Sequence, residues 1–208
     1  MAIEDIFQAV VHFDLAGVKD IVQKEIDKGT PVDEILNTGL IAALDEVGKK
    51  FSEGELFVPE MLMAAQAMKS GVAVLQPLLT DEISNAKGTV VIGTVKGDLH
   101  DIGKNLVVIM MEGAGFNVVD LGVDVNAEQF VTAAKENNAN IVALSALLTT
   151  TMTVMETTVQ TIKDAGLSAR TIIGGAPVTQ AFADQIGADG FGKDAHSAVK
   201  TAQELVAA

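Results

Sequence analysis

The sequence predicts an α/β protein in which a helical N-terminal half precedes a doubly wound parallel sheet. Two observations carry this prediction. Apolar residues recur at helical spacing up to about residue 80. From residue 89 onward, short runs rich in β-branched residues alternate with helical stretches, which is typical of a parallel sheet covered on both faces. The polar segment between these patterns, residues 81–88, ends in glycine and is predicted to be a linker.

The N-terminal half, residues 1–80, is predicted to form a four-helix bundle. The tripeptide Gly-Thr-Pro at residues 29–31 stops one helix and starts the next, and Pro59 suits the first turn of the last helix. The expected helices cover about residues 6–13, 18–26, 35–51 and 59–79.

The C-terminal half, residues 89–208, is predicted to contain five β/α units, which together make a flavodoxin-like, Rossmann-like fold. The expected strands are 89–95, 118–121, 141–147, 171–173 and a weaker one near 188–191. The expected helices lie near 102–113, 127–137, 152–165, 179–186 and 195–206.

Composition excludes several kinds of partner. The 208 residues carry a net charge of −14, so phosphate-rich nucleic acids and anionic membranes would be repelled. Cysteine is absent, which excludes disulfides and thiolate metal sites and fits a reducing compartment. The acidic N-terminus does not resemble a signal peptide, and no apolar run approaches the ~20 residues of a membrane span. A cytoplasmic protein is expected.

A histidine and two aspartates follow the first predicted strand, within GTVKGDLHDIGKNL at residues 93–106. Ligands of open α/β sheets bind at this edge, beyond the carboxyl ends of the strands. A phosphate-binding loop would need a Gly-Lys-Ser or Gly-Lys-Thr ending, which the stretch lacks. A receiver domain would need an acid at the end of the third strand, where Ser145 stands. A lone histidine at a helix start is by default a capped or solvent-exposed residue.

The spacing of Asp98 and His100 favours a metal ligand instead. A carboxylate that binds one imidazole nitrogen fixes the tautomer and leaves the other nitrogen free for a metal. One histidine cannot hold a bare ion, and His12 and His196 lie in other parts of the chain. The pattern therefore suggests a metal already held by a macrocycle, which needs a single axial donor.

Three motifs resemble those of cobalamin-binding domains. Residues 98–103 (Asp-Leu-His-Asp-Ile-Gly) fit the family's Asp-x-His-x-x-Gly signature. Residues 145–147 fit its Ser-x-Leu and residues 174–175 its Gly-Gly, in family order and spacing. Phe51 and residues 56–61 resemble the helical cap of cobalamin-dependent methionine synthase. The whole chain is similar to free-standing corrinoid proteins of methanol, methylamine and aryl methyl ether methyltransferase systems, so the resemblance does not select a methyl donor.

The resemblance implies cobalamin as the cofactor, either methylcobalamin or a related corrinoid, with His100 as the ligand of its cobalt. The cofactor's dimethylbenzimidazole would be displaced, the base-off/His-on arrangement. Asp98 would hydrogen-bond His100, and Thr151 stands where methionine synthase has the serine that completes this relay. Further implied cofactor contacts are Gly97, Asp101, Ile102 and Gly103 in the loop; Ser145, Leu147 and Thr149 on one side of a slot for the displaced tail; Gly174 and Gly175 on another; and Gly192 at its far end.

The helical half would cover the upper face of the corrin ring. Phe51, Val58 and Met61 match the family's cap contacts, although the helical stripe that contains Met61 is also typical of a bundle core. For four polar residues of the C-terminal half, a general structural role is expected. Asp101 is expected as an N-cap or first-turn acid of the helix, and Lys104 as a solvated surface residue, with contact to a corrin side chain as its alternative. Asp120 and Asp124 are expected as loop residues or amide partners.

The implied function is that of a methyl carrier. Cobalt in the Co(I) state would take a methyl group and, as methyl-Co(III), pass it on. The chain would be the cofactor-bearing subunit, without a substrate-binding catalytic domain. Its expected partners are a substrate-specific methyltransferase on the donor side, a second methyltransferase on the acceptor side, and a reductive activase. A cobalamin-responsive sensor or a cobalamin-storage module is the alternative. Flavin binding is disfavoured because aromatic residues are only 4% of the chain.

Overall fold

The computed structural model describes residues 2–78 and 87–207, and the chain divides into two compact units, one helical and one α/β. The predicted linker at residues 81–88 lies outside the described residues except for Lys87 and Gly88. None of the helices in the two described ranges is both long enough and apolar enough to cross a membrane.

The helical unit contains the four predicted helical segments. The third is continuous from α3 through a π-helical stretch, η1, into α4, which the sequence pattern did not predict. The apolar stripes of the helical unit are buried as expected, and Ile6, Val18 and Leu40 are fully enclosed. The elements are α1 (Ala2–Val11), α2 (Leu15–Asp27), α3 (Val32–Glu34), η1 (Ile35–Ile41), α4 (Ala42–Ser52), α5 (Val58–Leu75) and the 3₁₀ turn η2 (Gln76–Leu78).

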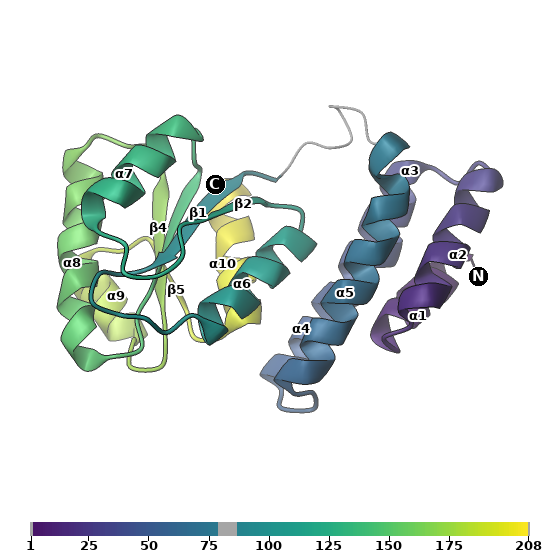
Figure 1. Ribbon diagram of the computed structural model, residues 1–208, viewed down its shortest axis with the longest axis horizontal. Helices are drawn as coiled ribbons and strands as arrows, with labels where there is room; N and C mark the ends of the chain where they lie inside the picture. Colours follow the sequence, from purple (N-terminus) through teal and green to yellow (C-terminus); the bar gives the residue numbers. More distant parts are fainter. Residues whose placement is uncertain (1, 79–86, 208) are drawn as a thin grey trace. The chain divides into compact units, whose positions relative to one another are not determined.

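The α/β unit is the predicted doubly wound sheet. Five parallel strands lie in the order β2-β1-β3-β4-β5. Helices α6 and α10 cover one face, and α7, α8 and α9 cover the other (Figure 1). The elements are β1 (Thr89–Thr94), α6 (Ile102–Gly113), β2 (Asn117–Asp120), α7 (Ala127–Glu136), β3 (Ile141–Ser145), α8 (Thr149–Asp164), β4 (Arg170–Gly174), α9 (Gln180–Ile186), β5 (Gly190–Gly192) and α10 (Ala195–Ala207).

The strand order creates a switch point between β1 and β3. From β1 the chain moves outward to β2, then returns to the other side of β1 to add β3, β4 and β5. The loops after β1 and β3 therefore leave the sheet in opposite directions, which opens a crevice at their carboxyl ends. Strand register places Thr94 beside Ser145, Ser145 beside Gly174, and Gly174 beside Gly192 along this edge.

Two predicted boundaries differ from the structure at this switch point. The strand expected to reach Leu147 ends at Ser145, and the helix expected from residue 152 begins at Thr149. The backbone N–H groups of Leu147 and Leu148 donate to the side chain of Asp98 instead of to a neighbouring strand. The carboxylate of Asp98, about 50 residues away in sequence, thus binds the N–H groups that would otherwise extend the strand. The local pattern of apolar residues does not indicate this contact.

Candidate functional site

The loop after β1 brings Asp98 and His100 into direct contact, as their spacing predicts. Nδ1 of His100 lies 2.6 Å from Oδ1 of Asp98. Asp98 is fully buried, whereas the imidazole is 50% exposed. Because an ionised carboxylate only accepts hydrogen bonds, Nδ1 carries a proton, and in the neutral imidazole Nε2 then keeps its lone pair. The histidine is therefore oriented as a one-nitrogen donor with its free nitrogen available to a ligand.

Asp98 stays ionised although it is buried. Burial by itself would raise the pKa of this carboxyl, but the hydrogen bonds it accepts hold the pKa well below its usual range. The donors are the backbone N–H of Leu147 at 2.8 Å and of Leu148 at 3.2 Å, the ring and backbone N–H of His100 at 2.6 and 3.1 Å, and the hydroxyl of Thr151 at 2.9 Å.

Thr151 occupies the relay position that the resemblance implies. Its hydroxyl lies 2.9 Å from Oδ2 of Asp98 and also 2.9 Å from the carbonyl oxygen of Leu148. Thr151 is buried in the first turn of α8, and the turn fixes the direction of its hydroxyl. Threonine thus reaches the same carboxylate despite its additional methyl group.

The backbone of His100 is held at both ends. Its N–H donates to Oδ1 of Asp98, and its carbonyl accepts from the hydroxyl of Thr94 at 2.9 Å. At the start of the loop, Gly97 adopts a left-handed φ of +84° and donates its N–H to Oδ1 of Asp124 at 2.7 Å. These contacts fix the loop although the imidazole itself is half exposed.

Exposed apolar side chains occur in the two loops that meet at Asp98. Leu99 is 72% exposed and Ile102 81%, and Leu147 and Leu148 from the loop after β3 are each about two-fifths exposed. Large exposed apolar side chains that cluster are typical of ligand or interaction surfaces. A half-exposed imidazole on a loop with such residues fits a large, flat, mostly apolar group that brings its own metal.

Three of the predicted cofactor-binding glycines fall into two groups. A Cβ atom built on Gly103 would meet nothing within 4 Å, so the space beside it is open. A Cβ on Gly174 would lie 2.8 Å from the carbonyl oxygen of Gly192, and one on Gly175, whose φ is +128°, would collide with the carbonyl of Ala146. The sheet itself therefore requires glycine at 174 and 175, and their place in a slot for the cofactor tail stays a prediction.

The other predicted contacts of the α/β unit lie along the same edge. Ser145 ends β3 and Thr149 begins α8, where it is exposed. Asp101 directly precedes α6, as expected for an N-cap residue, and its Oδ2 accepts from the side-chain amide of Asn105 at 3.1 Å.

The predicted cap contacts lie on α4 and α5 of the helical unit. Val58, in the first turn of α5, is 37% exposed, and Phe51 on α4 is half-buried. Met61 is fully buried. Phe57, which lies in the cap motif but is not among the predicted contacts, is 70% exposed directly before α5. Their cap role stays a prediction.

Lys104 is not the solvated surface residue that the sequence suggested. Its side chain is 1% exposed, and Nζ lies 2.5 Å from Oδ2 of Asp120 and 2.7 Å from Oδ1 of Asn105. Sequence analysis also left Asp120 and Asp124 without a role. The available signal was their position, Asp120 as the last residue of β2 and Asp124 shortly after it, which places them at the same sheet edge as His100.

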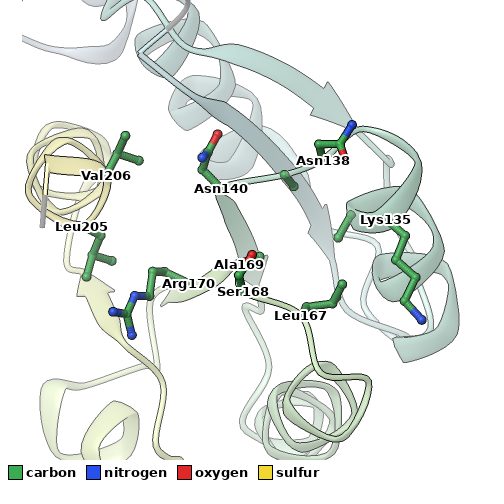
Figure 2. Close-up of a pocket in the computed structure, with 11 residues that line it drawn as sticks. Lys135, Asn138, Asn140, Leu167, Ser168, Ala169, Arg170, Leu205 and Val206 are labelled. Carbon is green, nitrogen blue, oxygen red and sulfur yellow. The ribbon is translucent and has the colours of Figure 1, made fainter.

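A separate pocket of about 430 Å³ lies at the opposite edge of the sheet, where β3 and β4 begin (Figure 2). Arg170 and Lys135 stand on different sides of it, so their charges do not converge. Arg170 instead pairs with Asp189 at 3.1 Å. The residues around His100, not this pocket, form the candidate site.

Comparisons with known proteins find cobalamin-binding relatives. Two family models, each described as a B12 binding domain, match residues 88–200 and 2–76. The dimethylamine corrinoid protein of Methanosarcina barkeri is 42% identical over 213 residues, covering 100% of both chains. A cobalamin-binding protein from Desulfitobacterium hafniense DCB-2 matches in structure with a TM-score of 0.84 and 33% identity over 98% of both chains.

The methanol:cobalamin methyltransferase complex MtaBC from Methanosarcina barkeri also matches, with a TM-score of 0.82 and 32% identity. The match covers 99% of this chain and 80% of that one. The fold, the site and these relatives lead to one conclusion: the chain belongs to the family of corrinoid proteins of methyltransferase systems, whose cofactor is cobalamin.

Proposed function

We propose that this chain carries a methyl group between partner methyltransferases on a cobalamin bound base-off, with His100 as the axial ligand. The single observation that carries the proposal is the contact of His100 Nδ1 with the buried carboxylate of Asp98. That contact leaves Nε2 as the free donor of a half-exposed ring. The exposed apolar side chains of the same loops offer a surface on which the corrin ring can pack, which supports the proposal.

The chain's own residues hold and tune the donor. Asp98 keeps the proton on Nδ1 and raises the basicity of Nε2. Thr151 donates to the same carboxylate, so loss or gain of the axial bond can be coupled to small shifts of hydrogen bonds along Thr151, Asp98 and His100. When bound, cobalamin supplies a cobalt that accepts a methyl group in its Co(I) state and gives it up from Co(III).

The methyl donor and acceptor are expected to be bound by partner chains. Relatives named for dimethylamine and for methanol are similar to this chain over nearly its whole length, which supports a carrier common to different donors. We propose a substrate-specific methyltransferase on the donor side, a second methyltransferase on the acceptor side, and a reductive activase. With a net charge of −14 on the carrier, docking surfaces of these partners should be neutral or basic.

The axial ligand can be tested by electron paramagnetic resonance. The protein is produced with histidine labelled with the heavy isotope of nitrogen, loaded with unlabelled hydroxocobalamin and reduced to Co(II). Histidine coordination gives a doublet on each cobalt line, whereas the cofactor's own base gives a triplet. We expect the doublet in the wild type and its loss in His100→Ala.

The matched control is His12→Ala. His12 is an exposed histidine on the helical unit whose Nδ1 contacts the carbonyl of Gln8, and its removal should leave the doublet unchanged. A triplet in the labelled wild-type protein, or a doublet that survives in His100→Ala, would refute the assignment.

A further inference from the structure

Lys104 carries a buried charge that fold stability alone does not require. Lysine is among the residues least often buried, and burying an ion pair commonly contributes no more stability than apolar residues of similar volume. Yet the ammonium of Lys104 sits in the first turn of α6 with 1% of its side chain exposed, held by Asp120 and Asn105.

The contacts of Lys104 connect the end of β2 to the residue that follows His100. Asp120 ends β2, and its Oδ1 accepts from the N–H of Gly122 at 2.9 Å, while its Oδ2 binds Lys104. Asn105 accepts from Lys104 and donates its own amide to Oδ2 of Asp101. The backbone N–H of Asn105 also binds the carbonyl of Asp101 at 2.7 Å.

The segment after β2 holds the other end of the same loop through Asp124. Its Oδ1 accepts from the N–H of Gly97, and its own N–H donates to the carbonyl of Asp98 at 3.1 Å. The loop that carries His100 is therefore anchored before the histidine by Asp124 and after it by the Lys104–Asp120 pair. The hydrogen bond to Asp98 orients the half-exposed imidazole, and these anchors hold the loop that carries it.

We propose that Lys104 and Asp120 form a positioning pair that presents His100 to cobalt. By holding the first turn of α6 against the end of β2, the pair keeps the loop in its ligating shape before the cofactor arrives, which lowers the cost of binding. This inference rests on the proposed axial role of His100, and it assigns to both residues a function that neither the motif nor the local sequence indicates.

The test uses Lys104→Met, which has a similar volume and no charge, so that the side chain stays compatible with its buried site. Three quantities are measured on the full chain: the dissociation constant for hydroxocobalamin, the share of Co(II) signal with the histidine doublet, and the thermal midpoint without cofactor. We expect the dissociation constant to be about tenfold larger and the share of Co(II) signal with the histidine doublet to be smaller. Far-ultraviolet circular dichroism should stay unchanged.

Two further variants separate positioning from general stability. Asp120→Asn should reduce the doublet in the same direction, and the double variant should fall short of the sum of the single effects because both act through one contact. Lys28→Met removes the ion pair with buried Glu25 in the helical unit, where Lys28 Nζ lies 2.7 Å from Oε1, and should leave the doublet intact.

The outcomes are distinct. A Lys104→Met protein with the wild-type dissociation constant and doublet overturns the inference, even if its thermal midpoint is lower, because the pair would then be structural only. If the wild type itself shows no histidine doublet, the proposed axial ligation fails, and the positioning role fails with it.

Discussion

Among single residues, Asp98 does the most to organise the site. Its two oxygens accept hydrogen bonds from the histidine, from the loop after β3 and from the first turn of α8, so one carboxylate joins three segments. The same bonds set the charge of Asp98, and that charge sets the tautomer of His100. A substitution of Asp98 therefore changes both the hydrogen bonds that join these segments and the tautomer of His100.

Replacing Asp98 with asparagine should lower both stability and its dependence on pH. The pKa of Asp98 is lowered in the folded state relative to about 3.9 in an unfolded chain, so ionised Asp98 stabilises the fold at neutral pH. This contribution is lost as pH falls below about 4. We expect Asp98→Asn to lower the free energy of unfolding by about 1–3 kcal/mol at pH 7. Its loss of stability on acidification should be shallower than that of the wild type.

Urea unfolding of the cofactor-free chain at several pH values measures both effects. Asp20→Asn, on the exposed face of α2, is the matched control and should follow the wild-type curve. Equal acid dependence in Asp98→Asn and wild type would show that the buried carboxylate is not the group whose charge is linked to folding.

At the scale of elements, the switch point between β1 and β3 explains why the motifs lie where they do. The signature around His100 follows β1, Ser145 ends β3, and Gly174 ends β4. Parallel pairing puts these ends in register, so residues separated by tens of positions share one edge. The glycines let neighbouring backbones approach each other there, which is a requirement of the sheet as well as of any ligand.

Alanine at position 174 should destabilise the sheet. Its Cβ would lie 2.8 Å from the carbonyl oxygen of Gly192, so β4 and β5 would have to separate. We expect a loss of about 1–3 kcal/mol in the free energy of unfolding, measured by urea titration without cofactor. Gly103→Ala is the control, because its Cβ meets open space and alanine is favoured over glycine in a helix by up to about 1 kcal/mol. Equal stability of the two variants would contradict the close approach of β4 and β5.

At the scale of the whole molecule, a cofactor that binds only the folded chain must stabilise it. A ligand at about 100 times its dissociation constant contributes about 2.7 kcal/mol, which for a chain of this size corresponds to roughly 5–10 °C in the thermal midpoint. Hydroxocobalamin should therefore raise the midpoint of the wild type by that amount, and by less in His100→Ala.

Circular dichroism melting checks this prediction, with flavin mononucleotide as the ligand control. Flavin should leave the midpoint unchanged, since few aromatic residues are present to stack on it. If flavin raised the thermal midpoint as much as hydroxocobalamin does, the crevice would not be selective for a corrin.

The sequence by itself determined the helical half, the five β/α units and the positions of the three motifs. Each of these depends on neighbours within a few residues: helical spacing, β-branched runs, and the Asp98–His100 pair two positions apart. The same short-range reasoning placed Asp101 before α6, where the structure has it.

The resemblance implied Asp98 and Thr151 as supports of His100, and only the tertiary structure showed how they meet and which other residues join them. Asp98 meets Leu147 and Thr151 across 49 and 53 positions, and Lys104 meets Asp120 across 16. Such contacts form when β1, β2 and β3 pair side by side, and no local pattern encodes them. The burial of Lys104, the early end of β3 and the backbone reason for Gly174 follow from that pairing, because a hydrogen bond depends on distance in space and not along the chain.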